Sequence, residues 1–168
     1  MHKVFFPSLF LLIILGALIG FSSSEIKANT SGTNVVISQL QIRATGEAND
    51  EFVEIYNPTN GSIDLSGWRL TRKSAAGAQS TLVSNISGNI APHGYFLIAH
   101  PDFTGITADL SYSATSSGIA NDNTVILYSD AGTTVVDKVG FGVNPVTDVE
   151  STQFAQNPAA GESIIRKA

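Results

Sequence analysis

Residues 49–57 read NDEFVEIYN, and this short stretch decides the fold of the chain. Val53 and Ile55 alternate with Phe52, Glu54 and Tyr56. Successive side chains of a β-strand point to opposite faces of its sheet. The pattern therefore predicts a strand that turns its two aliphatic residues into a hydrophobic core. An Asn-Pro pair follows at once and predicts that the strand ends there.

Glu54 lies among aromatic residues on the other face of this strand, where an unpaired carboxylate is costly to bury. We expect its carboxylate to accept hydrogen bonds from backbone N–H groups or from Arg69. The alternative is one half of a catalytic carboxylate pair with Asp50 or Glu51. Because a buried carboxylate is expected to be paired, the structural role is favoured.

The rest of the chain repeats this scheme, with short β-type runs separated by turn residues and no helical period kept over three turns. The pattern predicts an all-β sandwich, with a barrel as the structural alternative. We expect residues 71–89 to form a mobile connection and residues 104–120 to form a long loop. The expected strands lie at residues 35–44, 52–56, 63–65, 68–70, 95–99, 124–128, 133–139 and 163–166.

The composition narrows the function classes. The chain has 168 residues, 14% of them charged, with 15 glycines and no cysteine. Disulfides, thiolate catalysis and cysteine-based metal sites are therefore excluded. The formal net charge is -5, and removal of residues 1–28 leaves 7 basic and 13 acidic residues, a net charge of -6. Non-specific nucleic-acid binding needs an excess of Lys and Arg, so this balance counts against it.

The N-terminal residues 1–28 resemble an export signal. Lys3 supplies a positive start, and an apolar stretch covers residues 4–21 before a small-polar patch. The alternative is an uncleaved membrane anchor, because such a stretch is close to the length that spans a bilayer. Both readings predict a secreted or extracytoplasmic, membrane-anchored protein. Residues 29–34 form a polar linker, and residues 35–168 form the domain.

The stretch IDLSGW at residues 63–68 predicts a strand that turns a corner. Asp64 and Ser66 can close the bend through hydrogen bonds to nearby backbone. Gly67 supplies a position where a positive φ or close packing is allowed. Trp68, the single tryptophan, is expected to anchor the core.

These motifs resemble those of the lamin tail domain family in its bacterial, exported form. The motifs run in order from NDEFVEIYN through IDLSGWRL (63–70) and IAPHGYFLI (90–98) to NDN (121–123) and VDKVGFG (136–142). The resemblance implies an immunoglobulin-like β-sandwich, and it does not imply an enzyme. It makes Asp122 and Asp137 framework residues, and it implies an interaction module for proteins and, in lamins, partly for nucleic acid. Bacterial relatives occur alone or beside hydrolase and nuclease domains.

The candidate sites are few, and we expect no catalytic, cofactor or metal site. Asp122 is expected to close a local turn, with calcium bound by Asp102, Asp109, Asp122 and Asp130 as the alternative. Long loops on a rigid sandwich often bind ligands. Phe103, Asp109 and Tyr112 are therefore the candidate contacts, against the alternative of a loop packed on its own sheet.

Three functions remain open. The first is a non-catalytic interaction module at the cell exterior that binds a protein or an envelope polymer. The second is an accessory domain of a larger exported enzyme, since related chains continue beyond the point that corresponds to Ala168. The third is DNA binding, by analogy with lamins, which the net charge disfavours.

Overall fold

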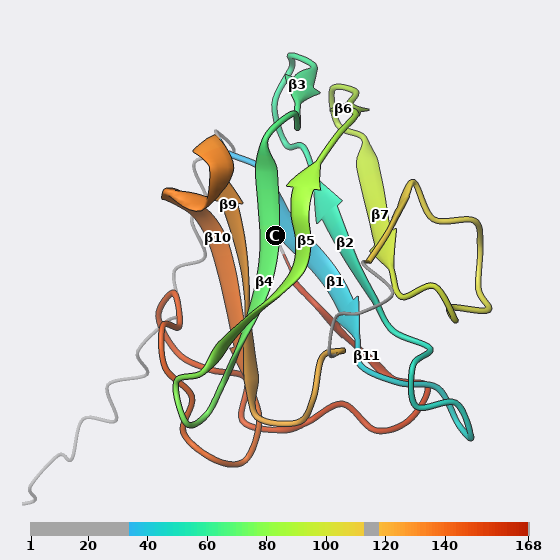
Figure 1. The fold of residues 1–168 in the computed structure, drawn as a ribbon, viewed down its shortest axis with the longest axis vertical. Helices are drawn as coiled ribbons and strands as arrows, with labels where there is room; N and C mark the ends of the chain where they lie inside the picture. The colour runs from blue at the N-terminus through green and yellow to red at the C-terminus, as the bar shows by residue number, and fades with distance from the viewer. Residues whose placement is uncertain (1–33, 113–117, 168) are drawn as a thin grey trace, which may run out of the picture.

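Two β-sheets packed face to face make up the domain in a computed structural model that describes residues 34–112 and 118–167 (Figure 1). The first sheet has five strands in the order β11-β1-β2-β7-β8, and the second has four in the order β10-β9-β4-β5. A small two-stranded ladder of β3 and β6 lies at one end. The sandwich predicted from the strand pattern is therefore confirmed.

The strand bounds follow the apolar runs closely. The five-stranded sheet contains β1 (Val36–Gln41), β2 (Phe52–Tyr56), β7 (Tyr95–Ala99), β8 (Leu110–Ser111) and β11 (Ser163–Ile165). The four-stranded sheet contains β4 (Trp68–Ser74), β5 (Gln79–Ile86), β9 (Asn123–Ser129) and β10 (Thr134–Phe141). The end ladder pairs β3 (Ile63–Asp64) with β6 (Asn89–Ile90), and a 3-10 turn, η1 (Asp130–Gly132), joins β9 to β10.

The core lies between the two sheets, and β2 occupies the middle of the larger one. Val53 and Ile55 are fully buried there, as the alternation predicts, and they pack with Leu70 and Leu127 from the opposite sheet. Phe52, Glu54 and Tyr56 lie on the outer face and are half-buried. All four residues from Phe96 to Ala99 on β7 are buried, whereas Tyr95 is 62% exposed.

The expectation of a mobile connection at residues 71–89 is wrong. Strand β4 extends to Ser74, and β5 follows from Gln79 with Leu82, Val83 and Ile86 buried in the core. The β4–β5 ladder changes register twice, so the apolar residues of β5 do not alternate regularly. A β-bulge shifts one strand by a residue and breaks the period of two that a sequence pattern needs.

Trp68 is half-buried at the margin of the core, so its expected role as the core anchor is overstated. Leu65, three residues earlier, is the fully buried side chain of this corner. Gly67 has φ 80°, as the corner motif predicts, and a Cβ at this position would contact nothing, so the backbone conformation alone favours glycine. The export signal at 1–28 and residues 29–33 of the linker lie outside the described residues. No helix within the described ranges is long and apolar enough to cross a membrane.

Candidate binding surfaces

The three loop residues predicted to contact a ligand do not form one surface. Phe103 is half-buried and packs edge-on against Phe52, with ring centroids 5.4 Å apart. Asp109 is exposed, but its Oδ2 accepts a hydrogen bond of 2.8 Å from the backbone N–H of Leu97. Tyr112 is buried, which contradicts its predicted role as an exposed contact. These residues fasten the loop to its own sheet.

Tyr112 belongs instead to a buried polar cluster that the sequence did not reveal. Glu51 is only 1% exposed, and its Oε2 accepts a hydrogen bond of 2.5 Å from the backbone N–H of Ile119. A Cβ on Gly118 would lie 1.9 Å from Glu51 Oε1, so the carboxyl group occupies space that only glycine leaves. The Tyr112 hydroxyl is buried and has no hydrogen-bond partner in the described structure. His100 packs edge-on against the Tyr112 ring at 6.0 Å.

Burial dominates the electrostatics of this cluster. It raises the pKa of Glu51 to about 7, although the Ile119 N–H and the positive charge of Arg72 both act to lower it. Burial also raises the pKa of the Tyr112 phenol, and the nearby Glu51 charge adds to the effect. A carboxyl group with such a pKa suits general acid–base catalysis. However, neither of the two cavities described below is lined by Glu51, Tyr112 or His100.

Asp137 on β10 is a second buried carboxylate, and it connects this strand to β1 and to Arg166. Its side chain is buried, Oδ2 accepts a hydrogen bond of 2.6 Å from the backbone N–H of Ile37, and both oxygens lie 2.9 Å from Arg166 Nη2. Arg166 also donates from Nε to the Ile37 carbonyl and from Nη1 to Glu150. Burial raises the pKa of Asp137 to about 6 even though Arg166 and the Ile37 N–H lower it. The predicted framework role of Asp137 fits these contacts.

Asp122 fastens the loops at the lower end of the sandwich. Its carboxylate accepts hydrogen bonds from the backbone N–H groups of Val143 and Asn144 and from the side-chain amides of Asn144 and Asn157. These bonds, first the one from the Asn144 side chain, lower the pKa of Asp122. Its backbone has φ 55°, and a Cβ on Gly142 would lie 2.2 Å from Oδ1. The carboxylate therefore connects the turn at Asp122 to the segment of Val143 and Asn144 and to Asn157. This role is wider than the local turn that the sequence predicts.

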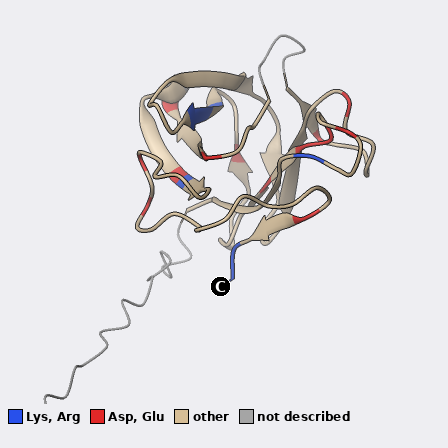
Figure 2. Ribbon diagram, turned by 90° about the horizontal axis from the view of Figure 1, so that it is seen from below, with Lys and Arg blue, Asp and Glu red and all other residues tan. Residues whose placement is uncertain are grey.

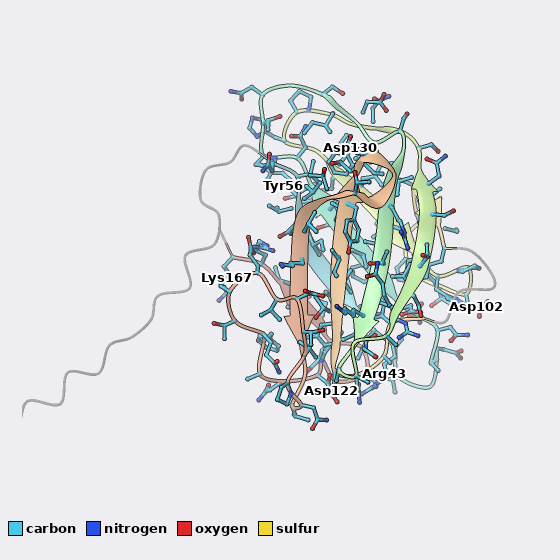
Figure 3. The ribbon with its side chains drawn as sticks, turned by 60° about the vertical axis from the view of Figure 1, so that its left-hand side comes forward. Arg43, Tyr56, Asp102, Asp122, Asp130 and Lys167 are labelled. Atoms are coloured by element: carbon cyan, nitrogen blue, oxygen red, sulfur yellow. The ribbon has the colours of Figure 1, made fainter. Side chains whose placement is uncertain are left out.

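The calcium alternative finds no support in the described structure. Figure 3 shows Asp102, Asp122 and Asp130 at three separate parts of the molecule. Asp109, the residue before β8, instead accepts a hydrogen bond from the backbone N–H of Leu97. Among the described residues, no group of three or more His, Asp or Glu side chains could hold a metal ion.

The remaining framework predictions concern Asp64 and Glu54. Asp64 Oδ1 accepts hydrogen bonds from the backbone N–H and the hydroxyl of Ser66, at 2.9 and 2.6 Å, which closes the predicted bend and lowers the pKa of Asp64. Glu54 Oε1 accepts a hydrogen bond of 2.6 Å from Ser38 Oγ. Arg69 is not its partner, because this residue lies in the opposite sheet and donates to Thr81.

An aromatic pair of a half-buried and an exposed tyrosine lies on the first sheet, at the end opposite Asp122. Tyr56 and Tyr95 are cross-strand partners on β2 and β7, with ring centroids 4.8 Å apart and planes inclined by 34°. His93 lies 3.5 Å from the Tyr56 hydroxyl through Nδ1 and 2.9 Å from Asn60 Oδ1 through Nε2. His93 has φ 53°, so the turn holds it in a conformation that non-glycine residues rarely adopt. Figure 3 places Tyr56 at the end opposite Asp122 and Arg43.

A groove of about 290 Å³ opens between β1 and β11 on one side and β10 on the other. Its apolar lining comes from both sheets and from Phe154. Its charged lining consists of Lys138, Glu150, Arg166 and Lys167. A second hollow, of about 250 Å³, lies beside Trp68 and Val135.

Two packed, mainly antiparallel sheets, a corner with Gly67 and Trp68, and the buried framework carboxylate of Asp137 define the chain as an immunoglobulin-like β-sandwich. The model of the Lamin Tail Domain matches residues 28–142, which is more than half of the chain. The chain therefore belongs to the lamin tail domain family, as its motifs indicate. No curated protein matches the sequence.

Proposed function

We propose that this domain is a non-catalytic interaction module at the cell exterior, and that it binds an envelope component through the Tyr56–Tyr95 pair. The observation that carries the proposal is this aromatic pair, in which Tyr95 is 62% exposed and Tyr56 is half-buried. Tyrosine is enriched at binding surfaces because it buries a large area with little loss of side-chain entropy and keeps a polar tip. Export of the chain rests on the signal-like residues 1–28.

The surroundings of the pair favour binding over a purely structural role. Tyr95 leaves 62% of its surface in solvent, so little of its apolar area stabilises the fold. The Asn57 side chain bonds to the carbonyl groups of Gly61, Ile90 and Ala91, and so fixes the two turns beside the pair. A surface held rigid before binding loses less entropy when a partner docks.

The absence of catalysis is part of the same proposal. The carboxylates of Asp64, Asp122 and Asp137 are each engaged by donors that hold the fold together. Glu51 has a pKa suited to proton transfer, but it is covered by Gly118 and Ile119. A general base must reach the proton that it abstracts.

A pull-down from solubilised envelope tests the proposal. We expect the wild-type protein to retain an envelope component. The double variant Tyr56→Ala/Tyr95→Ala should retain at least about tenfold less of it, because aromatic anchors dominate interface energies. Ile106→Ala is the matched control, because Ile106 is also an exposed apolar side chain but lies elsewhere. Equal retention by all three proteins would refute the role of the pair. Hydrolysis of envelope polymer that disappears in Glu51→Gln would refute the non-catalytic assignment.

A further inference from the structure

We infer that the groove between β1, β11 and β10 binds an extended peptide of another protein that carries both acidic and apolar side chains. This groove is lined by neither Tyr56 nor Tyr95. Figure 3 shows Lys167, which lines it, between the two ends of the molecule. The inference therefore uses a surface that the proposed function does not need.

The walls of the groove offer apolar contacts to such a peptide. Val139 and Ile164 line it from β10 and β11 and are half-buried, and Phe154 lines it with 49% of its surface exposed. A cavity of about 290 Å³ is at the small end for pockets that bind whole small molecules, and it suits a few side chains of a longer ligand. Apolar side chains placed here would be removed from water on both sides.

The edge of β10 offers backbone contacts. Over residues 134–139 this strand pairs only with β9 among the described residues, so its other edge has no strand partner there. Just beyond, Phe154 already pairs with the same edge in parallel, because its N–H donates to the Gly140 carbonyl and its carbonyl accepts from Gly142. An extended peptide can add to an unpaired sheet edge by the same type of hydrogen bond.

The charge of the groove selects an acidic ligand. Lys138, Arg166 and Lys167 line it, against Glu150 alone, in a chain whose formal net charge is -5. Arg166 is committed to Asp137 and Glu150, whereas neither lysine has an ion pair within 4.0 Å among the described residues. The hydrogen bond and charge of Lys73 lower the pKa of Asp148 and the charge of Lys138 adds to this effect, so Lys138 already interacts with one carboxylate outside the groove lining. Figure 2 shows the basic segment that follows β11 at the C-terminal end. Complementary charges of this kind raise the association rate and exclude partners of like charge.

Three capped hexapeptides can test the inference on the purified protein. The first alternates Glu with Val, the second replaces each Glu with Gln, and the third replaces each Glu with Lys. Fluorescence anisotropy gives their affinities, and amide chemical shifts give their position. We expect the Glu peptide to bind at least about tenfold more tightly than the Lys peptide, with shifts confined to residues 37–40, 138–140 and 163–167.

Variants locate the charge dependence. We expect Lys138→Gln/Lys167→Gln to weaken the Glu peptide about tenfold and to leave the Gln peptide unchanged. The matched control is Gln79→Glu/Ser84→Glu, which lowers the net charge by the same amount on exposed positions of β5. Equal binding of all three peptides, shifts outside the groove, or equal weakening in the control would each overturn the inference. Tyr56→Ala/Tyr95→Ala should keep full peptide binding, so this groove and the proposed function can fail separately.

Discussion

Asp137 and Glu51 are two of the three buried carboxylates of the described structure, the third being Asp50, and the protein accommodates these two differently. Asp137 receives a backbone N–H and an arginine that contacts both of its oxygens, and it links β1, β10 and the residue that follows β11. Among the described residues, Glu51 receives one backbone N–H, from Ile119, and no ion pair within 4.0 Å. The pKa of Asp137 rises to about 6, and that of Glu51 rises to about 7.

Asp137 therefore stabilises the fold through its partners, whereas the burial of Glu51 costs free energy when this group is ionised. A buried carboxylate with several donors becomes costly to remove, because its partners are then left buried and unpaired. A buried carboxylate with one neutral donor becomes costly to ionise. Replacement of each group should therefore change stability in opposite directions.

Removal of Asp137 is expected to have the largest effect. Asp137→Ala leaves Arg166 and the Ile37 N–H without their shared acceptor, so we expect the free energy of unfolding to fall by about 3–5 kcal/mol, as for other broken buried ion pairs. Urea denaturation at pH 7.5, followed by tryptophan fluorescence, measures the loss. Glu150→Gln removes a partly exposed partner of the same arginine and should cost less than about 1 kcal/mol. Equal losses in the two variants would contradict the role assigned to Asp137.

Glu51→Gln is expected to stabilise the protein, and only at higher pH. A carboxyl group whose pKa rises from 4.5 to about 7 binds its proton more tightly in the folded state, so stability falls as the pH increases through this window. The loss amounts to at most about 3 kcal/mol above pH 7. Gln keeps an acceptor for the Ile119 N–H and carries no charge, so the variant should avoid this loss.

The free energy of unfolding of the wild type and of Glu51→Gln, measured from pH 4 to pH 8, separates the effect of Glu51 from that of Asp137. The raised pKa of Asp137 lowers stability between about pH 3.8 and 6 in both proteins, so it cancels in the difference between them. We expect the two proteins to match near pH 4 and to diverge progressively up to pH 7. A constant difference at every pH would mean that Gln changes packing and that ionisation of Glu51 is irrelevant.

The sequence predicts the framework better than it predicts these buried charges. Strand β2 follows from regular alternation, and β9 and β10 follow from two β-type runs with a turn between them, whereas β5 does not emerge from the sequence because two register shifts break its pattern. Asp137 lies in a recognisable family motif, but its partner Arg166 reaches it only because β11 pairs with β1. Glu51 stands in a polar run before β2, and the backbone that covers it comes from 68 residues further along the chain. Local patterns report periodicity and turns, and they contain no information about such distant contacts.

Tyr112→Phe is expected to have the smallest effect, and it tests whether the polar groups around Glu51 lack hydrogen-bond partners. The Tyr112 hydroxyl is buried without a described partner, and such a group loses its hydrogen bonds to water without replacement. Phe keeps the ring against His100 and removes the hydroxyl, so we expect stability to be unchanged or to increase by up to about 1 kcal/mol. Urea denaturation of the single variants and of Tyr112→Phe/Glu51→Gln measures whether the two gains add. A loss of more than about 1 kcal/mol in Tyr112→Phe would instead show that the hydroxyl is bonded in solution, and the region around Glu51 would then be a satisfied network like that of Asp137.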